Sequence, residues 1–151
     1  MKPFLIFLFA IVLLILTGWV LLNFVFLSEE ERIERVIEKG RRSVENGSIF
    51  SLRNLFTEDY SDSSGQSLDE IMGSAQCMFS DTANRKIHIA GSSIRASGDK
   101  AEAEVRYVFH CQSKNSFIDH YLSANNSDVR TVRIVFVKNS RRWKICHTDH
   151  M

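Results

Sequence analysis

The stretch KAEAEVRYVFHCQ, residues 100–112, alternates apolar and polar side chains along most of its length. Its apolar members are Ala101, Ala103, Val105, Tyr107, Phe109 and Cys111. A period of two residues predicts a long β-strand with one buried face. The turn formers Ser97-Gly98-Asp99 precede this stretch, so the segment around Ile87 and Ile89 is expected to be its antiparallel neighbour.

Two further strands are predicted downstream, on either side of a turn at residues 138–141. Their apolar faces are formed by Val132, Ile134 and Phe136, and by Trp143, Ile145 and His147. No proline follows Pro3, which suits long central strands in a strongly curved sheet. We therefore expect an antiparallel sheet of about four strands.

Three helices are expected ahead of this sheet. The pairs Ser28 with Glu31 and Ser67 with Glu70 have the spacing of capping boxes, and apolar residues recur at helical intervals after each pair. A shorter apolar stripe lies between these two helices, at residues 49–56. Residues 57–66, TEDYSDSSGQ, are rich in turn formers and predict a loop. Helices followed by strands are typical of an α+β fold.

An apolar run precedes the predicted domain. Residues 4–27, FLIFLFAIVLLILTGWVLLNFVFL, contain no charged side chain. As a helix, Phe4 to Leu27 would be about 36 Å long, which is enough to cross a hydrocarbon core of ~30 Å. Cleavable secretory signals have shorter apolar regions, usually of ~7–15 residues. We therefore expect an uncleaved single-pass signal-anchor in residues 1–27 and one domain in residues 28–151.

Two signals for the orientation of this anchor disagree. Lys2 is the only Lys or Arg before the run, whereas several follow it, and the positive-inside bias would place the domain in the cytoplasm. The very short head and the acidic residues Glu29, Glu30 and Glu31 favour the opposite orientation. We expect an inner (plasma) membrane protein whose C-terminal domain is periplasmic, or more generally extracytoplasmic.

Three stretches resemble a known superfamily: Phe56–Gly65, the turn Gly98-Asp99-Lys100-Ala101, and the closing segment VRTVRIVFVKNSRRWKICH with its Trp143. Through them, residues 29–150 resemble the nuclear transport factor 2-like superfamily, also called cystatin-like. The resemblance implies a cone of three helices packed on a curved sheet. This superfamily includes ketosteroid isomerase, scytalone dehydratase and limonene epoxide hydrolase as well as non-catalytic binding domains, so it does not choose a function.

An anchor in front of such a domain is similar to the inner-membrane assembly component of type IV secretion systems, although this chain nearly lacks the cytoplasmic head of that component. Enzymes of the superfamily place a carboxylate, tyrosine or histidine inside the cone, where burial tunes its pKa. Alternation places three such candidates, Tyr107, His147 and Asp149, on the inner face of the sheet, where Trp143 would line the same pocket. A histidine near the end of a closing strand usually has a structural role, so no catalytic residue is assigned.

Two groups of residues are candidates for contact with a partner. The closing hairpin is basic and includes Arg141, Arg142 and Lys144, and the connection before it carries Phe117 and Tyr121, which could form one apolar side of a short helix. Each group also has an interpretation without a partner: the basic hairpin is simply solvated, and the connection forms a lid that closes the cone. With 19 basic and 18 acidic residues the chain has a net charge of +1, which argues against nucleic-acid binding.

Motifs for cofactors and metals are absent from the sequence. It contains no GxGxxG, phosphate loop, GxSxG, HExxH or paired CxxC, so neither a cofactor nor a metal is predicted. Cys146, His147 and His150 are metal-ligand types, but alternation places His147 on the other strand face from its neighbours. Cys111 and Cys146 are likewise expected on different faces and should not form a disulfide.

These observations predict a membrane-anchored, non-catalytic binding or assembly domain of the cell envelope that docks another protein or a second copy of itself. The alternative is a small-ligand pocket, or a proton-transfer or hydration enzyme of the ketosteroid isomerase-like type, which would need an open cone with converging polar groups.

Overall fold

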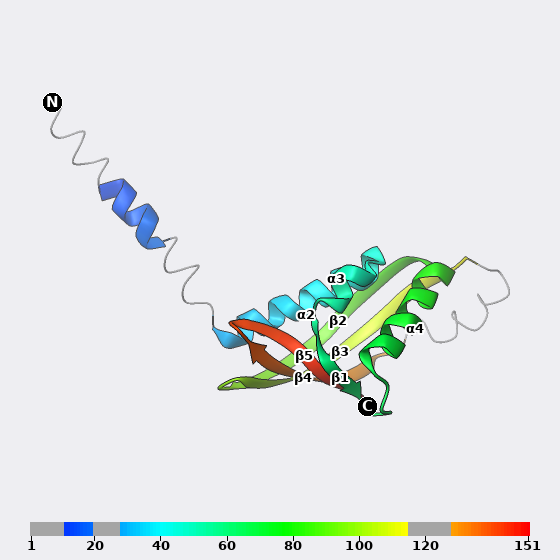
Figure 1. Ribbon diagram of the computed structural model, residues 1–151. Helices are drawn as coiled ribbons and strands as arrows, with labels where there is room; N and C mark the ends of the chain where they lie inside the picture. The colour runs from blue at the N-terminus through cyan, green and yellow to red at the C-terminus, as the bar shows by residue number, and fades with distance from the viewer. Residues whose placement is uncertain (1–10, 20–27, 115–127) are drawn as a thin grey trace.

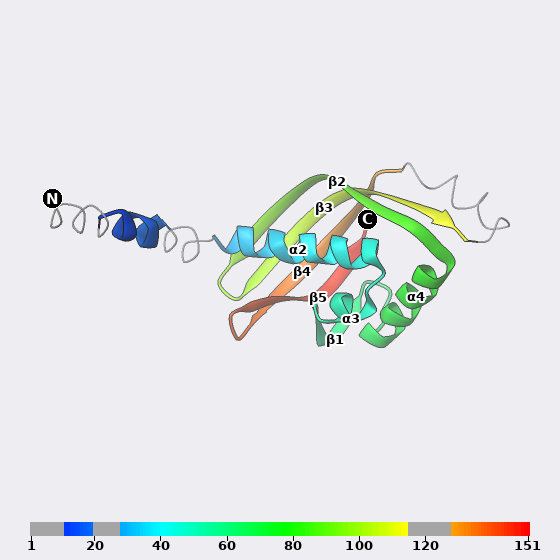
Figure 2. The same ribbon diagram turned by 90° about the horizontal axis from the view of Figure 1, so that it is seen from above.

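The computed structural model describes residues 11–19, 28–114 and 128–151. The helices of the domain are α2 (Glu29–Asn46), α3 (Ile49–Arg53) and α4 (Leu68–Asp81). Its strands are β1 (Phe56–Asp62), β2 (Thr82–Ser97), β3 (Lys100–Ser113), β4 (Arg130–Asn139) and β5 (Arg142–His150). The helices lie on one side of the sheet, with α2 running across it (Figures 1 and 2). The predicted α+β layout is confirmed.

Only part of the predicted anchor can be compared with the structure. Residues 11–19 are helical, and their large apolar side chains, from Ile11 to Leu16 and at Trp19, are exposed. Within the described ranges, no helix is both long and apolar enough to span a membrane. The remainder of Phe4 to Leu27 lies outside the described residues.

The sheet has five strands in the order β1-β5-β4-β3-β2. Four of them pair antiparallel, as predicted, but β1 is parallel to β5, with Ser61 opposite His147 and Asp62 opposite Thr148. The prediction of a loop over residues 57–66 was therefore wrong for its first half. Backbone pairing forms this strand despite its polar sequence: the Ile145 N–H donates to the Leu55 carbonyl (2.8 Å) and the Ser63 N–H to the Thr148 carbonyl (3.0 Å).

Both predicted helix starts are confirmed. The Glu31 N–H donates to the Ser28 hydroxyl (3.2 Å), while the Glu31 carboxylate accepts from the Ser28 N–H (3.0 Å), so the two residues satisfy each other's backbone donors. At α4, the Glu70 carboxylate accepts from the Ser67 N–H (2.7 Å). Helix α2 is followed by Gly47, whose φ of 67° lies in the left-handed region that glycine adopts most readily.

The core lies between α2 and the concave face of the sheet. Ile33 of α2 and Phe136 of β4 are fully buried, and they share one cluster with Ala101, Ala103 and Trp143. The alternation seen in residues 101–105 is therefore a true inner face. The partly buried Ile89 and Ile94 of β2 extend the same apolar surface.

A β-bulge in β5 changes which residues face this core. Phe136 pairs with Ile145, but the preceding residue of β4, Val135, pairs with His147, so Cys146 has no opposite residue. One extra residue reverses the alternation. Beyond the bulge, Thr148 and His150 continue the inner face, whereas His147 and Asp149 lie on the outer face. The predicted placement of His147 and Asp149 beside Trp143 and Ile145 was therefore wrong.

Candidate binding cleft

The four predicted pocket residues are not brought together. Tyr107 is on the inner face, opposite Arg130 of β4, while Trp143 is opposite Lys138 at the other end of the same strand. Eight residues of β4 separate these two positions, about 27 Å at ~3.4 Å per residue. Because the bulge moves His147 and Asp149 to the outer face, no cluster of polar groups forms from this set.

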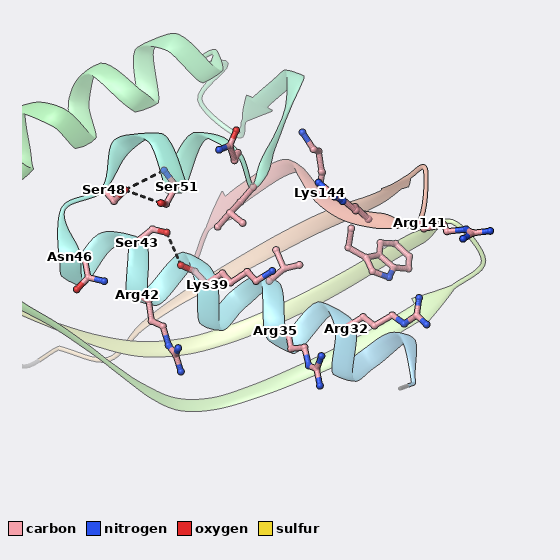
Figure 3. Close-up of a pocket in the computed structure, with 15 residues that line it drawn as sticks. Arg32, Arg35, Lys39, Arg42, Ser43, Asn46, Ser48, Ser51, Arg141 and Lys144 are labelled. Carbon is pink, nitrogen blue, oxygen red and sulfur yellow. Dashed lines mark hydrogen bonds between the residues drawn. The ribbon is translucent and has the colours of Figure 1, made fainter. Parts of the chain in front are cut away.

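A different group of residues forms a site beside α2. An open cleft of about 910 Å³ lies between α2, α3 and the β4–β5 hairpin. Seven basic side chains line it: Arg32, Arg35, Lys39, Arg42, Arg141, Arg142 and Lys144. None of the described residues that line it is acidic. Figure 3 shows Arg32, Arg35, Lys39 and Arg42 following one another along α2, and Arg141 and Lys144 on the β4–β5 hairpin.

The spacing of the basic residues on α2 builds one edge of the cleft. Arg32, Arg35, Lys39 and Arg42 are three, four and three residues apart. Residues at such intervals lie on one face of a helix. The apolar residues of α2 that face the core lie on the neighbouring face of the helix. Helix α2 therefore packs against the sheet with one face and presents a row of cations beside it.

The hairpin tip forms the opposite edge with an unusual backbone. Ser140 and Arg141 both have positive φ, 46° and 76°, and Asn139 pairs with Arg142 across them. Two positive φ values in a two-residue hairpin loop are those of a type I′ turn, which normally favours Asn and Gly. A non-glycine residue held in this region costs on the order of 1 kcal/mol or more. This turn places Arg141 at the tip of the hairpin, where it lines the cleft.

The floor of the cleft is apolar. Val36, Leu55 and Trp143 contribute to its lining. The Trp143 indole N–H donates to one carboxylate oxygen of Glu29 (2.6 Å). The other oxygen of the same carboxylate accepts from the Lys138 ammonium (2.8 Å). Hydrogen bonds from Lys138 and then Trp143 lower the pKa of Glu29. This linkage ties the first turn of α2 to the hairpin and so holds the two edges of the cleft in place.

Most of the positive charge in the cleft is not neutralised by the protein. Arg42 bonds Glu38 (2.8 Å), and Arg32 lies 3.9 Å from Glu29. Within the described part of the chain, Arg35, Lys39 and Arg141 make no ion pair. Arg35 also borders a separate groove on the β2 side of α2, which Glu31, Glu34 and Glu38 line. The cleft is therefore suited to bind an anion.

Two acidic side chains of α2 are bound by Arg41, which is not part of the described lining of the cleft. Arg41 binds Glu38 (2.7 Å) and Glu45 (2.8 Å). Hydrogen bonds from Arg41 and then Arg42 lower the pKa of Glu38 to about 2, so that carboxyl group stays ionised. These carboxylates are not available to neutralise Lys39 or the hairpin cations.

The residues predicted to contact a partner differ in where the structure places them. Arg141, Arg142 and Lys144 line the cleft. Phe117 and Tyr121 lie outside the described residues. The α2 contribution was missed, although the spacing of Arg32, Arg35, Lys39 and Arg42 along one helix face was a signal for it.

The thiols play no part in the cleft. Burial raises the pKa of the Cys111 and Cys146 thiols. They belong to β3 and β5, which are separated by β4. Two strand spacings of ~4.8 Å exceed the Cα separation that a disulfide spans, so these cysteines cannot pair. Among the described residues, no group of three or more His, Cys, Asp or Glu side chains could hold a metal ion.

Comparisons with known proteins find similarity only at the level of structure. No family profile and no curated protein matches the sequence. A candidate scytalone dehydratase from Novosphingobium aromaticivorans superposes with a TM-score of 0.68 at 14% identity, over 81% of this chain and 82% of its own. A nuclear transport factor 2-like protein from Cytophaga hutchinsonii gives 0.64 at 14% identity, over 83% and 98%.

A superfamily member from Salmonella enterica serovar Typhimurium gives a TM-score of 0.62 at 16% identity, over 81% of this chain and 89% of its own. These identities establish a shared architecture and leave the chemistry of the site open. The order of elements, the curved sheet and these three superpositions agree: the domain has the nuclear transport factor 2-like, or cystatin-like, fold.

Proposed function

We propose that this chain is a non-catalytic binding module of the cell envelope, held in the inner membrane by residues 4–27, which docks another protein or a second copy of itself. One observation carries the docking part: seven cations surround a cleft that has no acidic residue in its described lining. Desolvated or closely spaced like charges repel one another, so such a cluster gains stability when an anionic partner enters. A purely structural surface has no need of it.

The membrane part rests on the uncharged run from Phe4 to Leu27 and on the exposure of its described apolar side chains, such as Leu14 (73%). Large exposed apolar surfaces in water mark contact with lipid or protein. Glu29, two residues past this run, contacts the hairpin, so the hairpin end of the cleft is the end where the anchor joins the domain.

The anchor and its orientation can be tested with the full chain. Membranes from cells that produce it are extracted with alkaline carbonate, and intact spheroplasts are treated with protease. A membrane-spanning anchor keeps the chain in the carbonate pellet, and a periplasmic domain is digested without lysis. A chain released by carbonate would refute the anchor, and digestion only after lysis would reverse the orientation.

Docking through the cleft can be tested in the same cells by site-specific cross-linking from a photoreactive residue at Ser51, which lines the cleft. We expect a discrete adduct that is lost in the double variant Lys39→Glu, Arg141→Glu. The matched control reverses two exposed cations of β2, Lys86→Glu and Arg95→Glu, and should keep the adduct. Loss of the adduct in both variants, or in neither, would refute docking through the cleft.

A second candidate function is a small-ligand pocket or a proton-transfer enzyme. The similarity to a candidate dehydratase favours it, as does Tyr60, a buried residue whose hydroxyl hydrogen-bonds Thr148 on the inner face. Burial raises the pKa of Tyr60, which keeps it protonated and able to donate. Native mass spectrometry of the chain, compared with the denatured sample, tests this candidate, because a bound small molecule would add mass that denaturation removes.

A further inference from the structure

We infer that the occupant of the cleft is an extended acidic peptide segment of a partner protein, in which carboxylate side chains alternate with small apolar ones. This inference rests on the proposed docking function and adds the chemistry of the partner. Three properties of the cleft carry it: the linear arrangement of its cations, its apolar floor, and hydrogen-bonding groups at one end.

The cations are arranged along a line. Arg32, Arg35, Lys39 and Arg42 follow one another along α2, and at ~1.5 Å per residue they span about 15 Å of the helix axis. Neighbouring cations are therefore about 4.5–6 Å apart along this axis. In an extended peptide, side chains on the same side recur every ~6.6–6.8 Å. An acid at every second position would meet successive cations within the reach of their flexible side chains.

The floor of the cleft is apolar. Val36 and Leu55 line it together with Trp143, a residue that is only 5% exposed. The floor thus offers apolar contacts between charged edges. Residues at alternate positions of an extended segment point to opposite sides, so a segment along the cleft can direct its acids toward α2 and its small apolar side chains toward Leu55 and Trp143 on the opposite side.

The end of the cleft next to α3 is polar and uncharged. Asn46, Ser48, Ser51 and Asn54 line it. The Ser48 hydroxyl caps α3 by accepting from the Ser51 N–H (3.3 Å). The side chains of Asn46 and Asn54 make no hydrogen bond to another described residue, so their amide groups can donate to and accept from a ligand. A peptide backbone needs such groups, because each of its N–H and C=O groups loses water on binding.

Two other anionic occupants fit less well. A bilayer surface is flat, whereas these cations surround a recess between a helix and a hairpin (Figure 3). A single-stranded nucleic acid would need exposed aromatic rings for its bases to stack on, and Trp143, the aromatic residue in the described lining, is buried. An acidic peptide needs neither a flat surface nor a stacking platform.

The test measures binding of a fluorescent octapeptide that alternates Glu and Val to the full chain in neutral detergent, by anisotropy. We expect saturable binding that weakens as salt is raised and is at least tenfold weaker for the double variant Lys39→Glu, Arg141→Glu. The control Lys86→Glu, Arg95→Glu should bind within twofold of the unmodified chain. Circular dichroism melting of each variant checks that the fold is retained.

Three competitors give the test its opposing outcomes: a block peptide with four Glu followed by four Val, a single-stranded oligonucleotide of equal charge, and vesicles with one third anionic phospholipid. Weaker competition by all three than by the alternating peptide supports the inference. Stronger competition by the oligonucleotide or the vesicles would overturn it, as would the absence of saturable peptide binding. If the Ser51 adduct persists in cells in that case, docking stands and only the chemistry of the partner is wrong.

Discussion

Arg85 of β2 joins the C-terminal ends of two helices, and its removal tests how the helices are fixed to the sheet. Its guanidinium donates to the carbonyls of Val44 (3.0 Å), Phe79 (3.2 Å) and Thr82 (2.6 Å). Val44 and Phe79 lie in the last turns of α2 and α4, where carbonyls lack helical partners and the helix dipole is negative. Neither last turn contains a basic residue of its own, so Arg85 supplies the positive charge for both helices.

The magnitude follows from these contacts. A hydrogen bond that involves a charged group contributes ~1.5–3 kcal/mol, and water can replace part of it because Arg85 is half-buried. We expect Arg85→Met, which keeps the length of the side chain, to lower the free energy of unfolding by about 3 kcal/mol. For a domain of this size that corresponds to a fall in Tm of roughly 10 °C. Arg85→Lys keeps the charge but has one nitrogen, and should lose about half as much.

Gly47 provides an internal check on this reasoning. A Cβ at Gly47 would lie 2.5 Å from the Arg85 guanidinium, and the residue has positive φ. Gly47→Ala should therefore cost ~1 kcal/mol for the left-handed backbone and a further amount for displacing the guanidinium. In the Arg85→Met background only the backbone cost remains, so the double variant should lose less than the sum of the single losses. Urea denaturation followed by circular dichroism measures all three variants. A loss below ~1 kcal/mol for Arg85→Met, or strict additivity, would refute this account of Arg85.

The remaining predictions concern the core and the acid stability of the domain. Phe136→Ala removes a fully buried ring and should cost ~3–5 kcal/mol in urea denaturation, whereas the same substitution at the exposed Phe50 should cost less than ~0.5. Ala103→Leu should cost ~1–3 kcal/mol, because the added atoms have no space beneath α2. Glu38 has a pKa lowered from 4.5 to about 2, so its ion pairs stabilise the fold above pH 4.5 and are lost as the pH falls toward 2. Glu38→Gln should flatten the dependence of stability on pH in that window. The effect should not exceed about 1 kcal/mol, because the side chain is 36% exposed and solvent screens it.

Periodicity and capping were sufficient to predict the helices and the inner face of β3, because burial on one side leaves a regular pattern in the sequence. Strand β1 left no such pattern. Its sequence, FTEDYSD, is mostly polar, and its extended conformation depends on hydrogen bonds with a strand about 88 positions away, as between Thr57 and Ile145. Local sequence carries no record of a partner so distant.

The bulge at Cys146 shows a second limit. Strict alternation from Trp143 predicts that His147 and Asp149 face the core, and one unpaired residue reverses that prediction. A cysteine side chain does not mark its position as the unpaired residue of a β-bulge, so nothing in the sequence indicates the bulge at Cys146. Any catalytic assignment that depended on the face of His147 therefore required the register, which only the structure supplies.

The overall charge of the chain does not show how its charged side chains are distributed, and we consider that distribution most informative. A net charge of +1 argues against a polyanion-binding protein only if the charges are mixed evenly. Along α2 they are not: Glu31, Glu34 and Glu38 border the groove beside β2, Arg32, Lys39 and Arg42 border the cleft beside the hairpin, and Arg35 borders both. Because local fields depend on nearby charges and are screened within ~8–10 Å in salt, the cleft is more positive than the groove on the other side of the helix. A neutral domain can thus offer a cationic site, and reversing two of its charges should abolish binding there without altering the opposite side of the helix.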